Sequence, residues 1–337
     1  MIKFYKLMFF NFLLLGTFIA ISSYSWFSMW IGLEINLLSI IPLLSNSQNL
    51  YPSEAAMKYF ITQTLASLIL LFSIILMLNF SEFLPQNSEN LLSMILNSSL
   101  LLKTGAAPFH AWFPEVMEGL SWLNCLIMLT WQKLAPMVIL MYNLNLTLFF
   151  SWIIIISSLV GGIMGLNQIS LRKIMAYSSI NHIAWMLASM MSFTSIWFFY
   201  FIIYSIISFN LISIFWYFNL YFSKQLFLIF SSSKLFSFFF SLNFLSLGGL
   251  PPFLGFLPKW LTVNYLINEK FYFLTLILIV STLITLFFYI RLTFSAFMIA
   301  KNEVILKLSF KNNYVLIFIN FFALIGLLAC TLILNVY

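Results

Sequence analysis

Five ionisable residues stand near the middle of otherwise apolar stretches of this sequence. Glu34 lies in "MWIGLEINLL" and Lys133 in "TWQKLAPM", and the other three are Lys103, His182 and Lys259. A charged group at the centre of a lipid bilayer costs about 2.5–3.5 kcal/mol on insertion scales. We therefore expect these side chains to pair with one another or with internal water. Because removal from water disfavours the charged forms of lysine and glutamate, such groups can change protonation state, and the series predicts proton transfer.

The composition of the chain indicates a membrane protein. Of the 337 residues, 63% are hydrophobic and only 7% are charged, whereas soluble domains carry about 25% charged residues. Nearly the whole chain is apolar, so no sizeable soluble domain is expected. The net charge of +7 has no water-facing domain on which to form a basic patch. This excludes a nucleic-acid-binding protein.

Spanning helices account for almost the entire length. A spanning helix needs about 20 apolar residues. Eleven segments fit this rule, at 7–23, 26–44, 57–80, 91–119, 122–142, 148–168, 174–192, 195–220, 235–268, 271–298 and 313–335. The first is interpreted as a spanning helix rather than a signal peptide, because every later segment is also apolar. The sequence thus predicts an all-α polytopic membrane protein with a single membrane domain over residues 1–337.

Basic residues in the predicted connections divide unequally between the two sides of the membrane. If successive connections alternate sides, one side collects ten lysines and arginines and the other collects Lys270 alone. The ten are Lys3, Lys6, Lys58, Arg172, Lys173, Lys224, Lys234, Lys301, Lys307 and Lys311. This pattern follows the positive-inside rule. It predicts an N-terminus on the cytoplasm-like side and a C-terminus on the opposite side.

Two of the segments contain helix-breaking residues in the same order. "GAAPFHAWFP" (105–114) and "GLPPFLGFLP" (249–258) both fit G-x-x-P-F-x-x-x-x-P. Each stands in the fourth segment of a set of five, and because five is odd, the second set enters the membrane from the opposite side. We therefore predict two inverted five-helix repeats, over 1–145 and 146–300, followed by a loop and a C-terminal helix over 301–337. Paired interrupted helices of this kind mark transport sites, since their freed backbone groups must face protein or water.

Simpler structural roles stay open for the same residues. The lysines and Glu34 would also serve as ion pairs between helices, and His182 would serve as a hydrogen-bonded core histidine. Arg291 lies near the end of its segment, where it can reach the interface as an anchor. Glu115 and Glu118 are expected at the membrane interface, and the sequence assigns no role to His110.

The residues present in the sequence do not support cofactor or metal chemistry. Two cysteines are too few for an iron–sulfur cluster, which takes four thiolates. The sequence contains no phosphate-binding loop and no cluster of metal ligands. We therefore expect this chain to bind no cofactor and no metal.

The quoted motifs together resemble a known family. "MWIGLEINLLSIIPLL", "LLKTGAAPFHAWFPEVMEGL", "TWQKLAPM", "SSINHIAWM" and "LSLGGLPPFLGFLPKW" are similar to the antiporter-like membrane-arm subunits of respiratory complex I, the mitochondrial NADH–ubiquinone oxidoreductase. Those subunits are similar in turn to subunits of multi-component sodium/proton antiporters. The resemblance covers essentially the whole chain. It implies eleven helices in the inner mitochondrial membrane, with the N-terminus in the matrix and the C-terminus in the intermembrane space.

The resemblance also implies a role for each of the five residues. Glu34 matches the glutamate of the first half-channel, and Lys103 and Lys259 match the lysines of the two broken helices. Lys133 matches the lysine that connects them, and His182 matches a polar position of the central hydrophilic axis.

The implied activity is proton translocation by an NADH:ubiquinone reductase. NADH oxidation and quinone reduction would take place in other subunits, which hold the NAD, FMN, iron–sulfur clusters and ubiquinone. The implied partners are the other membrane-arm subunits and membrane lipids. Two alternatives stay open: a sodium/proton antiporter subunit of the same fold, and a structural scaffold that passes no protons.

Overall fold

The part of the chain that the structure describes is helical, as expected of a polytopic membrane protein. The computed structural model describes residues 4–45, 49–80, 86–226, 234–251 and 253–298, and helices make up most of them. Within these ranges, seven helices are long and apolar enough to cross a membrane. The predicted C-terminal helix at 313–335 and the basic residues Lys301, Lys307 and Lys311 lie outside the described residues.

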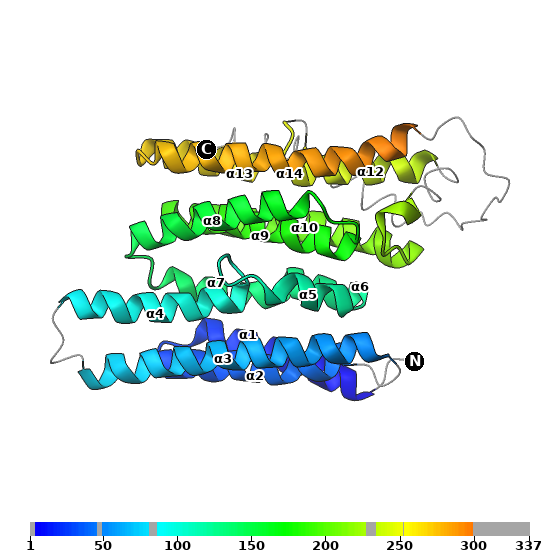
Figure 1. Cartoon of the computed structure of the whole chain (residues 1–337). Coiled ribbons are helices and arrows are strands. Elements are labelled where there is room, and N and C mark those ends of the chain that lie inside the picture. Colours follow the sequence, from blue (N-terminus) through cyan, green and yellow to red (C-terminus); the bar gives the residue numbers. More distant parts are fainter. Residues whose placement is uncertain (1–3, 46–48, 81–85, 227–233, 252, 299–337) are drawn as a thin grey trace. The chain divides into compact units, whose positions relative to one another are not determined.

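Most helices begin and end close to the predicted segments, and α2 coincides with the predicted 26–44. The helix α3 begins earlier than predicted because a proline, Pro52, is tolerated in the first turn of a helix. The helices in Figure 1 are α1 (Phe4–Ser22), α2 (Trp26–Leu44), α3 (Leu50–Phe80), α4 (Gln86–Thr104), α5 (Trp112–Gly119), α6 (Trp122–Leu129), α7 (Trp131–Met141), α8 (Thr147–Gly165), α9 (Leu171–Ser192), α10 (Thr194–Phe218), α12 (Lys234–Gly248), α13 (Phe256–Asn268) and α14 (Tyr272–Met298).

Two predicted segments are interrupted where the glycines and prolines indicated. Segment 91–119 divides into α4 and α5, and segment 235–268 divides into α12 and α13. A third interruption was not predicted: segment 122–142 divides at Thr130 into α6 and α7. The hydroxyl of Thr130 donates a 2.7 Å hydrogen bond to the carbonyl of Leu126, and such bonds to the preceding turn bend helices. The predicted spanning segment is confirmed, because the two pieces together form one apolar span.

The contacts between helices divide the chain into two compact units, Met1–Ile153 and Ile154–Tyr337. In the first unit, α1 packs closely on α2 through small residues. A Cβ added to Gly16 would lie 2.8 Å from the backbone nitrogen of Asn36, so no larger residue fits there. The helix α3 contacts α2, α4 and α5, and α7 contacts α1, α2 and α4. This packing makes α4, which carries Lys103, a direct neighbour of α7, which carries Lys133.

The central helix of the second unit is α9. It contacts α10, α13 and α14, and nearly all of its residues are buried. With 22 residues α9 is long enough to span a membrane, but it is not one of the seven strongly apolar helices among the described residues. The difference comes from a polar run in its middle, "SSINH" at 178–182. A polar helix that is buried on all sides faces other helices rather than lipid.

Candidate functional site

Glu34 and Lys103 approach each other inside the first unit. Glu34 lies in the middle of α2 and Lys103 in the last turn of α4, and the lysine Nζ is 3.9 Å from the glutamate Oε1. The side chain of Lys103 is 4% exposed and that of Glu34 is 23% exposed. The distance exceeds the roughly 2.7–2.9 Å of a charge-assisted hydrogen bond. The two groups therefore form a loose, largely buried ion pair.

A chain of polar side chains continues from this pair towards α7. The hydroxyl of Tyr59 donates to Oε1 of Gln132 at 3.2 Å, and Nε2 of Gln132 donates to Oδ1 of Asn36 at 2.9 Å. The Gln63 amide donates to the backbone carbonyl of Lys103 at 3.4 Å. These side chains line a cavity of about 10 Å³, near the lower limit of about 10–15 Å³ for one water molecule. This chain of polar side chains was not predicted from the sequence, although amide side chains within apolar helices are a visible signal of such a chain.

Lys133 is next to Gln132 in α7 and is almost completely buried, with 1% of its surface exposed. Its Nζ lies 5.4 Å from the centroid of the Phe113 ring, in the first turn of α5. The face of an aromatic ring attracts a cation, so Phe113 stabilises the charged form of Lys133. The contact also places Lys133 beside the break between α4 and α5.

The two broken helices end with the same backbone geometry. Gly105 follows α4 with a φ of 78°, and Gly249 follows α12 with a φ of 79°. In each case, the amide of the residue after the glycine donates to the carbonyl four positions before the glycine, at 3.1 Å and 3.3 Å respectively. This is a Schellman motif, in which glycine is favoured because it adopts a positive φ without strain. The first glycine of the shared sequence motif therefore stops each helix, and Pro252 of the motif lies outside the described residues.

Lys259, near the start of α13, reaches back across the second break. Its Nζ donates hydrogen bonds to the carbonyl oxygens of Gly248 at 2.9 Å and Leu247 at 3.2 Å, at the end of α12. The same nitrogen lies 5.8 Å from the centroid of the Trp185 ring. A cation is favoured at the C-terminal end of a helix, where the carbonyl dipoles converge. Lys259 is thus held by backbone dipoles and a ring, whereas Lys103 lies beside a carboxylate.

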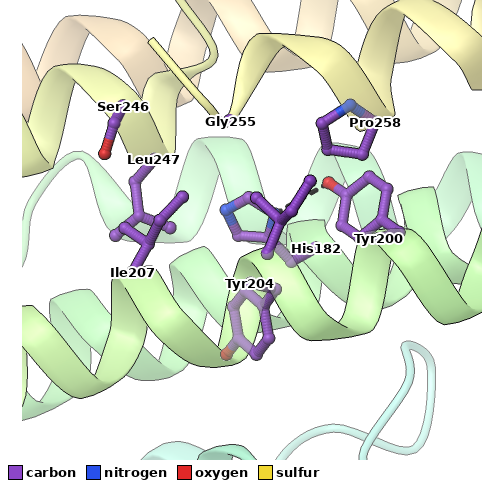
Figure 2. A pocket seen from close by; sticks show the side chains of 9 residues that line it. His182, Tyr200, Tyr204, Ile207, Ser246, Leu247, Gly255 and Pro258 are labelled. Carbon is purple, nitrogen blue, oxygen red and sulfur yellow. Dashed lines mark hydrogen bonds between the residues drawn. The ribbon is translucent and has the colours of Figure 1, made fainter. Parts of the chain in front are cut away.

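His182 shares a small cavity with the second break. Figure 2 shows its ring pointing towards α10, where Nδ1 lies 2.9 Å from the hydroxyl of Tyr200. The ring centroid of Tyr204, one turn along α10, is 5.0 Å from that of His182. Leu247 and Pro258, from the two sides of the break, line the same cavity of about 10 Å³. Leu247 thereby links the two predicted residues of the second unit, because its carbonyl also accepts the hydrogen bond from Lys259.

The five predicted residues therefore form two groups, one in each unit. Glu34, Lys103 and Lys133 belong to the first unit, and His182 and Lys259 belong to the second.

The remaining polar residues singled out from the sequence lie closer to the surface. Glu115 pairs with Lys58 at 2.7 Å, with more than half of each side chain exposed. Arg291 is exposed, and His110 is partly exposed with Nδ1 3.2 Å from the carbonyl of Pro108. In the part of the chain that the structure describes, no three His, Cys, Asp or Glu residues are grouped as metal ligands.

Comparisons with known proteins identify the family. The sequence model described as "NADH:quinone oxidoreductase/Mrp antiporter, TM" matches residues 23–285. The chain belongs to this family. A curated relative, NADH-ubiquinone oxidoreductase chain 2 of Anopheles gambiae, is 48% identical over 330 residues, which are 95% of this chain and 95% of that protein. The predicted resemblance to the complex I membrane-arm subunits is thereby confirmed.

Two solved structures of related complexes share the fold. A chain of respiratory complex I from Thermus thermophilus superimposes with a TM-score of 0.86 at 21% identity, over 97% of this chain and 79% of that one. A chain of the Mrp complex from Dietzia superimposes with a TM-score of 0.74 at 16% identity, over 83% of this chain and 58% of that one. This chain therefore shares its helical fold with a chain of each complex at low sequence identity.

Proposed function

We propose that this chain is a proton-translocating membrane-arm subunit of a mitochondrial NADH:ubiquinone oxidoreductase. Family membership and the 48% identity to an insect chain 2 support this assignment. The observation that carries the proton-transfer role is the burial of three lysines within apolar helices. Each lysine is 7% exposed or less, and one lies 3.9 Å from a glutamate. Groups buried at such cost in membrane proteins typically belong to ion or proton pathways.

The chain would work within a larger assembly in the inner mitochondrial membrane. Its partners would be the other membrane-arm subunits and membrane lipids. The NAD, FMN, iron–sulfur clusters and ubiquinone would be held by other subunits, and this chain would hold no redox centre. Protons would be moved here by electrostatic coupling to chemistry that takes place elsewhere in the complex.

The proposed architecture has eleven helices in two inverted five-helix repeats and a C-terminal helix. The repeats would cover 1–145 and 146–300, and residues 301–337 would form a loop and the last helix. The matching glycine-stopped helices at Gly105 and Gly249 support this division. The ten-to-one distribution of basic residues supports an N-terminus in the matrix and a C-terminus in the intermembrane space.

In the proposed mechanism, Glu34 sets the charge state of Lys103. When Glu34 is protonated, the buried ammonium of Lys103 loses its counter-charge and its positive charge becomes unfavourable. Lys103 then releases its proton towards Lys133, by way of the cavity and the polar chain at Gln132. His182 and Lys259 continue the transfer in the second unit, where Tyr200 holds the orientation of the imidazole.

The test removes the buried charge of Lys133 and measures the protons pumped per NADH in sealed membrane vesicles. Lys133→Met should lower this ratio or stall turnover in a fully assembled complex. The matched control is Lys270→Met, because Lys270 lies on an exposed turn between α13 and α14. Unchanged coupling in the Lys133→Met complex, with normal assembly, would contradict the proposal.

A sodium/proton antiporter subunit is the second candidate function, since the fold is shared with a chain of an Mrp complex. Sodium-dependent proton flux by the reconstituted chain, without NADH or quinone, would favour this function. Normal pumping in every lysine variant that assembles would instead indicate a structural scaffold.

A further inference from the structure

Asn210 is a buried polar side chain that takes no part in the site described above. It lies in α10 with 1% of its surface exposed. Neither Nδ2 nor Oδ1 has a hydrogen-bond partner among the residues that the structure describes. An amide side chain offers two donors and an oxygen with two lone pairs. Leaving all of them unpaired in a low-dielectric interior is unfavourable, so the position calls for a small polar ligand.

Asn210 lies on the face of α10 that lines the His182 cavity. Ile203 and Ile207 line this cavity together with His182, and Figure 2 shows Ile207 and His182 among its lining residues. Asn210 follows Ile203 by seven positions and Ile207 by three. Residues at these spacings share one face of a helix, so Asn210 stands one turn beyond the cavity.

One of the neighbours of α10 is α12, which runs in the opposite direction. Ile207 and Leu247 both line the cavity. Two turns later in α10, the ring centroid of Phe215 lies 5.6 Å from that of Phe240, which comes earlier in α12. Asn210 lies between Ile207 and Phe215 along α10. It therefore stands opposite the turn of α12 that contains Asn243, which is itself 0% exposed.

An aromatic cluster begins beside this position and continues along the interface away from His182. It consists of Phe215, Phe240 and Phe244, with ring centroids 4.9–6.2 Å apart. At most 1% of the surface of each of these residues is exposed. Asn210 is thus a buried polar position next to the His182 cavity, and apolar rings border it on the side of Phe215 and Phe240.

The amide of Asn210 has both donors and an acceptor, so its ligand should be able both to accept and to donate hydrogen bonds. A cation would satisfy only the oxygen of Asn210, and an anion would satisfy only the nitrogen. Water both accepts a hydrogen bond from Nδ2 and donates one to Oδ1, and buried waters commonly make about three such bonds. We propose that Asn210 binds a buried water molecule that extends the His182 cavity along the α10–α12 interface as far as the phenylalanine cluster.

The binding of this water is inferred from the burial of Asn210 and from its two unpaired amide atoms, but its role rests on the proposed function. If His182 carries protons, the water at Asn210 gives its cavity a hydrogen-bonded branch. The phenylalanine cluster ends the branch, because an apolar constriction resists hydration.

The first test is an electron cryomicroscopy map of the intact complex at a resolution that shows ordered water. We expect solvent density within hydrogen-bond distance of both Nδ2 and Oδ1 of Asn210, at about 2.7–3.2 Å. Absence of this density, in a map that resolves other buried waters, would overturn the proposal. So would a protein group bonded to both amide atoms.

The second test compares variants in the assembled complex. Asn210→Leu keeps a similar shape without polar atoms, and we expect it to lose the water density and to pump fewer protons per NADH. Ser208→Ala is the control, because Ser208 is equally buried in α10 but its hydroxyl bonds to its own helix, at the carbonyl of Ser205. If Asn210→Leu does not assemble, the map of the unmodified complex decides.

The outcomes separate this inference from the proposed function. Normal pumping by Asn210→Leu, alongside impaired pumping by Lys133→Met, would refute only the role of the water. Normal pumping by Lys133→Met would refute the proposed function, and the water density would still decide whether Asn210 binds water.

Discussion

Lys259 donates a hydrogen bond of 2.9 Å to the carbonyl oxygen of Gly248, from the start of α13 to the end of α12. Lys103 instead lies 3.9 Å from the carboxylate of Glu34. A carboxylate changes charge on protonation, whereas the dipole at a helix end does not. Both lysines at the broken helices have contacts among the described residues. Only Lys103 contacts a group that can change its charge, the carboxylate of Glu34.

The charge of Lys259 can be separated from its hydrogen bonds by substitution. Lys259→Gln keeps a donor for the carbonyls of Leu247 and Gly248, whereas Lys259→Met leaves them unpaired. An unsatisfied buried polar group costs about 1–3 kcal/mol, so the methionine variant should assemble less well than the glutamine variant. Both should pump fewer protons per NADH. Full pumping by Lys259→Gln would indicate that the lysine acts only as a helix cap.

Removal of the Glu34 carboxylate should reduce proton pumping more than removal of the carboxylate from a shorter but exposed ion pair. Glu34→Gln leaves the buried ammonium of Lys103 without its counter-charge, and we expect slower turnover and fewer protons per NADH. The control is Glu115→Gln. Its 2.7 Å pair with Lys58 is more than half exposed, and such pairs contribute about 0–1 kcal/mol. Equal effects of the two substitutions on pumping would speak against a special role for Glu34.

Close packing at the second break predicts that two glycines, Gly255 and Gly248, differ sharply in their tolerance of substitution by alanine. A Cβ added to Gly255 would overlap the carbonyl oxygen of Ser246, whereas one added to Gly248 would have ordinary contacts at 3.5–3.6 Å. Gly255→Ala should therefore force the two sides of the break apart and destabilise the chain by about 1–3 kcal/mol. Gly248→Ala should be tolerated. The thermal stability and yield of the purified complex would measure the contrast, and a stable Gly255→Ala complex would contradict it.

The matched glycines at the ends of α4 and α12 provide another comparison. Alanine at either position is strained by a φ near 80°, at a cost of about 1–2 kcal/mol. Only at Gly249 would the new Cβ also lie 2.8 Å from the Lys259 side chain, while at Gly105 its nearest contact is 3.4 Å. We expect similar losses of stability but a larger loss of pumping for Gly249→Ala. Equal pumping by the two variants would mean that displacement of Lys259 has no effect.

Local features of the fold were predictable because they depend on neighbouring residues. Long apolar runs predicted the spanning helices, and the shared glycine and proline pattern predicted where two of them are interrupted. The interruption at Thr130 was missed because a hydroxyl bonded to the preceding turn leaves no distinct pattern in an apolar run. The helix α9 was recognised by its length, but its burial on all sides appeared only from the packing of its neighbours.

The amino-acid sequence by itself determined that the chain is a membrane protein, which residues carry ionisable groups into the apolar interior, and where two helices must stop. These properties follow from composition and from backbone preferences that act over a few residues. Only the tertiary structure decided that Lys103 faces Glu34 while Lys259 faces the end of α12, and that His182 bonds to Tyr200. Contacts between side chains on different helices depend on how the helices rotate and pack against one another, and spacing along one segment carries no information about its neighbour.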